Sequence, residues 1–367
     1  MRAQLLLLLA GAHAAPLAPP ADDWEDLRAA IDAFPLVTDC VVSVGDSRGE
    51  LFRHAKGATT FDTEMRIFSA TKWVSGVMIV SAVEHGLLGL DDLAYEHLGY
   101  WTRDPENPRS RVTLRHLLSF TSGMGGSTSC PAEMDFATCV SDMYGRSSQN
   151  SEPGSQVVYN EVHLQYAGAM TLAAAGAGRT IEDLFERYVF GPAGMNETRF
   201  NGRAALGAGL LTTPAQYGRF LNEYFNHRLV SEAGRTEMER SSYPDAALSG
   251  LALLQGRYGL GNWFDCIPAI PFTAECEALD CHSSTGIAGY VPVTDRRLNY
   301  WINIGFEGAT GLGAVNGVAL RLAIKPVANA AILSSRGLSP SAEGAGPSVE
   351  AARELAMKAT RNGTLTP

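Results

Sequence analysis

The stretch RIFSATKWVSGVMIVSAVEHG, residues 66–86, decides the fold of this 367-residue chain. Its apolar residues surround the helix axis instead of forming one stripe, and this pattern predicts a buried helix from about Ser69 to His85. Gly86 follows at the position where glycine commonly ends a helix. The helix therefore begins at a serine and carries a lysine, Lys72, one turn further along.

The tetrad SATK at residues 69–72 has the S-x-x-K spacing. Residues three apart lie on one helical face, so the amine of Lys72 can reach the hydroxyl of Ser69. A serine hydroxyl becomes a good nucleophile only when a base takes its proton, and burial favours the unprotonated amine that can do so. The helix N-terminus adds backbone N–H groups beside the serine. Taken alone, the tetrad could be an N-cap and a surface charge, but the apolar helix around it favours catalysis.

Two further segments contain groups that such chemistry could use. A turn at residues 153–154 leads to Tyr159, whose hydroxyl could share or relay a proton between serine, lysine and leaving group. The segment HSSTG, residues 282–286, predicts a strand whose edge could supply the N–H of Thr285, with that of Ser69, as an oxyanion hole. Taken singly, Tyr159 could be a core tyrosine and the segment a plain strand.

The rest of the pattern predicts one α/β domain built from both halves of the chain, with a helical insert. Helical spacing covers residues 24–34, 163–175 and 314–333. Strands are predicted at residues 40–45, 51–55, 251–254, 258–264, 282–293 and 298–306. We expect a sheet domain at residues 24–86 and 211–333, a helical domain at residues 87–210 and a loose tail at residues 334–367.

The composition is that of a globular protein, with 46% hydrophobic and 19% charged residues. The net charge of -10 argues against nucleic acid or an anionic membrane as the partner, since both need a basic patch. The sequence lacks the G-x-S-x-G, H-E-x-x-H and P-loop patterns of rival enzymes, and G-x-G-x-x-G in a strand context.

The first 14 residues have the pattern of a signal peptide. Arg2 is followed by an apolar run and then by small residues around His13. The run is too short to span a bilayer, and no later stretch reaches about 18 apolar residues, so we expect secretion and no membrane span. The alternative is a poorly ordered apolar N-terminus. Sequons at Asn196 and Asn362 would be usable in a eukaryotic secretory pathway.

The six cysteines are an even number and fit disulfides in an oxidising compartment. They are Cys40, Cys130, Cys139, Cys266, Cys276 and Cys281. Cys130 and Cys139 lie in one irregular segment and would close a short loop, so we expect a disulfide between them. For the alternative, a zinc site, only Cys276-x4-Cys281-His282 comes near the required spacing.

Three motifs stand in one order along the chain: RIFSATK at residues 66–72, VEHGLLGLDD at 83–92 and VTLRHLLSFTSG at 112–123. With them, the sequence resembles the serine β-lactamase/DD-peptidase superfamily, in particular its class C and esterase-like branch. The motifs look like the family's nucleophile helix, its "EGKLSLDD" turn and its "TIRHLLTHTSG" segment. Residues 153–168 fall where the family has its Y-x-N motif, and the resemblance spans roughly residues 24–333.

The resemblance implies an α+β fold of the β-lactamase/transpeptidase type. This fold has an antiparallel sheet flanked by helices, an inserted all-helical domain and a groove between them. It also implies acyl-enzyme chemistry without metal or cofactor, in which Ser69 is the nucleophile, Lys72 the general base and Tyr159 its partner.

Two departures from the family bear on the substrate. The family's asparagine two residues after the tyrosine is Glu161 here, and its K-T-G triad is represented by His282, Ser283 and Ser284. In the family, both positions contact the acyl side chain or the carboxylate of β-lactams. An acidic residue and a lost lysine should repel an anion. We therefore expect esterase or peptidase-like hydrolysis of a small-molecule or peptide ester or amide, and not β-lactam hydrolysis. The alternative is a catalytically weak binding or assembly protein on the same fold.

Overall fold

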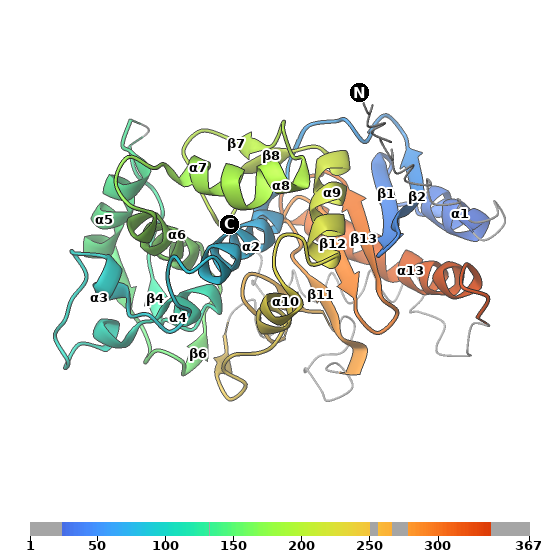
Figure 1. The fold of residues 1–367 in the computed structure, drawn as a ribbon. Coiled ribbons are helices and arrows are strands. Elements are labelled where there is room, and N and C mark those ends of the chain that lie inside the picture. The colour runs from blue at the N-terminus through green and yellow to red at the C-terminus, as the bar shows by residue number, and fades with distance from the viewer. Residues whose placement is uncertain (1–23, 132, 250–255, 266–277, 339–367) are drawn as a thin grey trace, which may run out of the picture.

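The computed structural model describes residues 24–131, 133–249, 256–265 and 278–338. Its largest sheet has six strands, and each neighbouring pair is antiparallel (Figure 1). In spatial order the strands are β10 (Trp263–Phe264), β11 (Cys281–Ser283), β12 (Val291–Asp295), β13 (Tyr300–Gly305), β1 (Cys40–Asp46) and β2 (Gly49–Lys56). Strands from both ends of the chain thus share one antiparallel sheet, which confirms the expected α+β fold.

The strands predicted at residues 40–45 and 51–55 are present as β1 and β2 and form an antiparallel hairpin. Every residue of β1 is buried, because β1 lies between β13 and β2 and has helices over both faces. β2 lies at the sheet edge, where only Phe52 of this strand is buried. Residues 47–48 form the turn, and Gly49 begins β2 at a φ of 120°, a conformation that glycine adopts more readily than other residues.

Residues 282–293 form two strands, so the prediction of one continuous strand is wrong. β11 ends at Ser283 and β12 begins at Val291, with a turn between them. Gly289 has a φ of 117° in this turn. Neighbouring Ala288 is buried, so the turn lies in the core and the hydropathy pattern gives no sign of it.

The strand predicted over residues 258–264 is shorter in the structure. Within this segment only Trp263 and Phe264 pair with β11, while Tyr258 makes an isolated bridge to Trp263. Short pairings outside the main sheet involve β3 (Met65–Arg66), β8 (Leu210–Thr212), β7 (Arg199–Phe200), β4 (Met124–Gly125), β5 (Ser148–Gln149), β6 (Gln156–Val157) and β9 (Ala247–Leu248).

Helices cover both faces of the sheet (Figure 1). On one face lie α1 (Glu25–Ala33) and α13 (Leu312–Ser334), and Leu27 and Ile31 of α1 are fully buried there. α9 (Pro214–Phe225) covers the other face through contacts with β1 and β13. The apolar spacing of residues 24–34 therefore predicted α1 correctly.

By length and composition alone, α13 could cross a membrane. Of its most apolar stretch, 50% is buried inside the protein, and the core helix of a soluble protein meets the same criteria. Two of its charged side chains form ion pairs, Arg321 with Asp265 and Lys325 with Asp295. The absence of a membrane span stays a prediction.

A mainly helical region lies beside the sheet, on the left in Figure 1. α2 (Thr71–Glu84) runs between the two regions and is buried along nearly its whole length, as its all-round apolar sequence predicted. Other helices are α3 (Ala94–His97), α4 (Leu114–Leu118), α5 (Phe136–Arg146), α6 (Val162–Ala175), α7 (Ile181–Phe185), α8 (Gly191–Ala193) and, packed on α2, α10 (Glu232–Met238). The domain limits inferred from the sequence stay predictions.

Several sequence predictions fall outside the described residues. These are the signal peptide at residues 1–14, the strand at 251–254, the sequon at Asn362 and most of the tail. The other sequon begins at Asn196, which is exposed in the turn before β7.

Candidate active site

Ser69 lies in a 3₁₀ turn, η2 (Phe68–Ala70), directly before α2. The predicted helix start is therefore correct to within two residues, and the serine stands at the N-terminal end of a buried helix. Phe68 has a φ of 45°, in the left-handed region that costs a non-glycine residue about 1–2 kcal/mol. Such strain is common next to reactive residues. Ser69 itself is half-buried, so part of its surface stays open to solvent.

Lys72 is buried, with 1% of its surface exposed. Its Nζ atom lies 3.1 Å from the Ser69 Oγ and 2.7 Å from the carbonyl oxygen of Gly207. Within the described parts of the chain these two oxygens are its hydrogen-bond partners, and neither belongs to a carboxylate. An amine held in this way can donate one N–H to Gly207 and, when unprotonated, accept the proton of Ser69.

Tyr159 lies beside this pair and presents its ring to the amine. The Lys72 Nζ is 4.7 Å from the centre of the Tyr159 ring, a cation–π distance. The ring stacks on Trp263 at 4.9 Å and meets Phe120 edge-on at 5.2 Å. Ser69, Lys72 and Tyr159 are all described, and no hydrogen bond joins the Tyr159 hydroxyl to the other two. A proton relay through that hydroxyl therefore needs a shift of the ring.

The segment that carries Tyr159 is anchored to the loop after α4. The Val158 N–H donates to the Phe120 carbonyl, 2.9 Å, and His163 of α6 meets the Val158 carbonyl through Nε2, 3.0 Å. The other ring nitrogen of His163 lies 3.0 Å from the Ser122 hydroxyl. Burial lowers the pKa of His163 to about 3, so its ring is neutral and can donate through one nitrogen and accept through the other.

Glu161 stands at the N-cap position of α6, half-buried beside Gly207. A side-chain carbon added to Gly207 would lie 3.0 Å from the Glu161 Cγ, so glycine leaves the room that the glutamate occupies. The Gly207 carbonyl is also the acceptor of Lys72, so both side chains lie around one residue. The structure describes Glu161 and Lys72 and has no ion pair between them.

Of the segment at residues 282–286, which was expected to lie beside Ser69, Ser284 makes the direct contact. The Ser284 hydroxyl donates to the Ser69 carbonyl, 2.8 Å. Thr285 follows in the chain and is half-buried, whereas Ser283 is buried at the end of β11. The structure thus brings Ser284, and with it Thr285, to the nucleophile.

His282 does not point to the nucleophile in the structure. Its side chain is fully buried, and its ring nitrogens lie 3.2 Å from the Asn262 Oδ1 and 3.1 Å from the Asp280 Oδ1. The hydrogen bond with His282 lowers the pKa of the Asp280 carboxyl. Both ring nitrogens are engaged within and beside the sheet, so a substrate contact by His282 would require these bonds to break.

Sequence reasoning missed Gly207 and Trp263. Gly207 lies 135 positions from Lys72 and meets it through a backbone oxygen, which no side-chain pattern reports. Trp263 stacks on Tyr159 from the edge strand β10. Trp263 is buried, so the sequence gives no signal that separates it from an ordinary core tryptophan.

Metal-binding groups do not gather in the described parts of the chain: no set of three or more His, Cys, Asp or Glu side chains there could hold an ion. Cys40 and Cys281 are free and buried. Burial raises the pKa of the Cys40 thiol to about 11 and that of Cys281 to about 12, so neither is a thiolate at neutral pH. Cys266 and Cys276, the latter needed for the zinc alternative, lie outside the described residues.

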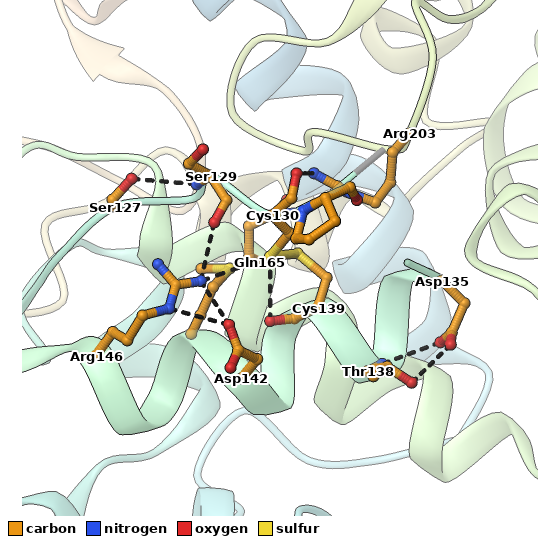
Figure 2. The surroundings of a disulfide bond; sticks show 12 residues. Ser127, Ser129, Cys130, Asp135, Thr138, Cys139, Asp142, Arg146, Gln165 and Arg203 are labelled. Atoms are coloured by element: carbon orange, nitrogen blue, oxygen red, sulfur yellow. Dashed lines mark hydrogen bonds and ion pairs between the residues drawn. A yellow bond between two sulfur atoms is a disulfide. The ribbon is translucent and has the colours of Figure 1, made fainter. Parts of the chain in front are cut away.

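Cys130 and Cys139 form a disulfide in the structure (Figure 2). The bond ties the loop after β4 to α5, in which Cys139 is fully buried. Arg203 donates to the Cys130 carbonyl, 3.2 Å, from the segment that leads on to Gly207. The disulfide loop is therefore in contact with the chain that supplies the acceptor of Lys72.

Comparison with known proteins places this arrangement in a family. The family model described as Beta-lactamase matches residues 27–265, more than half of the chain. A curated relative, the monacolin J acid methylbutanoyltransferase of Aspergillus terreus, is 25% identical over 161 residues. The match covers 38% of this chain and 38% of that protein, so the two align over well under half of the relative's length.

Solved structures share the fold. Simvastatin synthase (LovD) from Aspergillus terreus has a TM-score of 0.65 at 16% identity, covering 84% of this chain and 98% of its own. The β-lactamase Mb2281c from Mycobacterium bovis has a TM-score of 0.59 at 20% identity, covering 82% and 96%. EstCE1, described as a hydrolase with promiscuous acyltransferase activity, has a TM-score of 0.64 at 16% identity, covering 83% and 98%. These likenesses show the fold alone, and the family match over residues 27–265 shows that the chain belongs to the Beta-lactamase family.

Proposed function

We propose that the protein is a secreted serine hydrolase that forms an acyl intermediate on Ser69 and cleaves an ester or amide. The observation that carries the proposal is the 3.1 Å contact between the Lys72 Nζ and the Ser69 Oγ at the start of a buried helix. Membership of the Beta-lactamase family supports acyl chemistry. Secretion is supported by the signal-peptide pattern of residues 1–14 and by the Cys130–Cys139 disulfide.

In the first half-reaction, the unprotonated Lys72 amine takes the hydroxyl proton as the Ser69 Oγ bonds to the substrate carbonyl carbon. The N–H groups of Ser69 and Thr285 stabilise the oxyanion. Collapse of this intermediate breaks the bond to the leaving alcohol or amine, which takes the proton from the Lys72 ammonium, with Tyr159 beside it. Water then attacks the acyl ester and gives its proton to Lys72. This proton returns to Ser69 as the acid leaves.

The side chains around this centre favour a neutral or cationic acyl group. Glu161 places a carboxylate beside Gly207, where it would repel an anionic substrate. The half-buried Tyr159 ring, which stacks on the buried Trp263, adds an aromatic surface that suits an apolar group. We therefore propose an esterase or a peptidase-like enzyme acting on a small molecule or peptide, and not a β-lactam hydrolase.

Acyl transfer to an alcohol or amine is a second candidate. It is favoured by the match to a methylbutanoyltransferase and by the likeness to EstCE1, whose description joins hydrolase and acyltransferase activity. The chemistry requires no additional side chain, because the acceptor takes the place of water in the second half-reaction.

Labelling with a fluorophosphonate probe tests the nucleophile, because the probe reacts with an activated serine. The wild-type protein should be labelled and the Ser69→Ala protein should not. A binding or assembly protein would stay unlabelled in its wild-type form, and that result would overturn the proposal. An ester and amide panel, measured with and without an added alcohol, then separates hydrolysis from acyl transfer by the products formed.

A further inference from the structure

We propose that Gln165 is a positioning residue for the base: it fixes the backbone of residues 204–207 so that the Gly207 carbonyl holds the Lys72 amine toward Ser69. The inference rests on the proposed function, because it takes Lys72 to be the base. Within the described residues, Gln165 makes no hydrogen bond to Ser69 or to Lys72.

Gln165 lies on α6 with 3% of its surface exposed. Its Nε2 donates to the Ala204 carbonyl, 3.1 Å, and its Oε1 accepts from the Leu206 N–H, 2.7 Å. One side-chain amide therefore satisfies two backbone groups of the same segment, as a neighbouring strand would. This pairing sets the position of the segment along α6.

The segment held by Gln165 turns its next backbone groups to α2. The Leu206 carbonyl accepts from the Ser75 hydroxyl, 2.8 Å, and the Gly207 carbonyl accepts from the Lys72 Nζ, 2.7 Å. Leu206 also packs closely on α6, at Gly168 of this helix. A Cβ added to Gly168 would lie only 2.4 Å from the Leu206 Cδ2, so the glycine leaves the room that Leu206 occupies. The segment of residues 204–207 is therefore held by hydrogen bonds to α6 on one side and to α2 on the other.

The outer end of the segment is attached to the disulfide loop. Arg203 donates to the carbonyls of Cys130 and Pro131. Figure 2 shows Arg203 reaching this loop and Gln165 close to the disulfide. The segment therefore has two attachments, Arg203 to the disulfide loop and the Gln165 amide to α6, and the second lies between Arg203 and Gly207 along the chain.

The position of the Gly207 carbonyl matters because it orients the amine. An N–H directed at this oxygen leaves the lone pair free to face the Ser69 hydroxyl, and a misplacement of about 1 Å at a reacting group can cost roughly 100-fold in rate. Without the Gln165 amide, the Ala204 carbonyl and the Leu206 N–H lose their partners. The segment can then move away from α6, and the oxygen that holds Lys72 moves with it.

Gln216 on α9 provides a matched control. It is also a buried glutamine, with 4% of its surface exposed. Its Oε1 accepts from the Glu197 N–H, 3.1 Å, and from the Thr198 hydroxyl, 2.8 Å, so its amide likewise holds a neighbouring segment. That segment is the turn before β7, and it does not supply the acceptor of Lys72.

The experiment compares Gln165→Met with Gln216→Met in kcat and KM for a neutral ester, in the rate of fluorophosphonate labelling, and in thermal midpoint. Both variants should melt earlier than the wild type. Only Gln165→Met should lose about tenfold or more in kcat and in labelling rate, with KM unchanged. Should Gln165→Met fail to fold, the same result is expected of Gln165→Glu, which keeps the side-chain length and an acceptor for the Leu206 N–H.

Two results would overturn the inference alone: a Gln165 variant that keeps its kcat, or equal losses of kcat in the Gln165 and Gln216 variants, both with an active wild type. A wild-type protein without turnover and without labelling would instead overturn the proposed function, and this inference with it.

Discussion

Replacing Lys72 by arginine separates the charge of this residue from its capacity to accept a proton. A guanidinium stays protonated throughout the pH range in which proteins are folded, so it cannot take the proton of Ser69. A positioned general base contributes roughly 10²–10⁴-fold to a rate, and we therefore expect Lys72→Arg to lower the acylation rate by about 1000-fold.

The surroundings of Lys72 also determine how much the Lys72→Arg substitution should destabilise the folded protein. The residue is 1% exposed and has no carboxylate partner in the described parts of the chain, so the larger, permanently charged arginine should destabilise the fold. Lys72→Met is the control for packing, because it keeps the length and removes the charge. It leaves the Gly207 carbonyl without its donor, which costs about 1–3 kcal/mol if that oxygen stays dry.

The assay is the burst of p-nitrophenol released from an activated ester, which reports acylation directly. Thermal denaturation of each variant ensures that rates are compared at a temperature where all are folded. Both variants should show no measurable burst, and Lys72→Arg should melt no later than Lys72→Met. Acylation by Lys72→Arg within about threefold of the wild-type rate, a barrier change under about 1 kcal/mol, would refute the role of lysine as the base.

Three further outcomes are expected. Glu161→Asn should raise the rate with an anionic penicillin-like compound relative to a neutral short-chain ester, because it removes a carboxylate beside Gly207; an unchanged ratio would show that Glu161 does not face the substrate. Peptide mapping without reduction should recover Cys130 linked to Cys139, a bridge worth about 2–3 kcal/mol in the chain-entropy account, and two free thiols would contradict this. Burial lowers the pKa of His163 to about 3, whereas an unfolded histidine takes up its proton near about pH 6.5. Stability should therefore fall on acidification between these values, by about 1.4 kcal/mol per pH unit from this residue, and urea unfolding of His163→Gln should show a correspondingly smaller pH slope; equal slopes would exclude a neutral buried His163.

The parts of the site that depend on neighbours in the sequence could be predicted. Helix geometry alone brings residues three apart together, so the S-x-x-K spacing was enough to predict the contact between Ser69 and Lys72. The all-round apolar pattern predicted α2, and the short apolar runs on either side of residues 46–49 predicted the first two strands. The family resemblance, confirmed by the match over residues 27–265, supplied the antiparallel arrangement that these local patterns leave open.

The parts that depend on distant segments could not be predicted in this way. Gly207 offers a backbone oxygen, which every residue has, so no residue type indicates its role. Gln165 lies in a helix whose apolar sequence gives no reason to single out one amide. A strand pattern indicates which side chains alternate but not which partners lie on each face. The sequence therefore could not show that Asn262 and Asp280 hold His282, or that Ser284 contacts the backbone of the nucleophile Ser69.

The most direct test of the central claim is the mass of the protein during turnover. Intact-protein mass spectrometry after rapid acid quenching with an activated ester should show wild-type protein carrying one acyl group, on the peptide that contains Ser69. Ser69→Ala should keep the wild-type thermal midpoint, gain no acyl mass and lose essentially all turnover. Undiminished ester hydrolysis by purified Ser69→Ala, or an acyl group located on another residue, would contradict catalysis through Ser69.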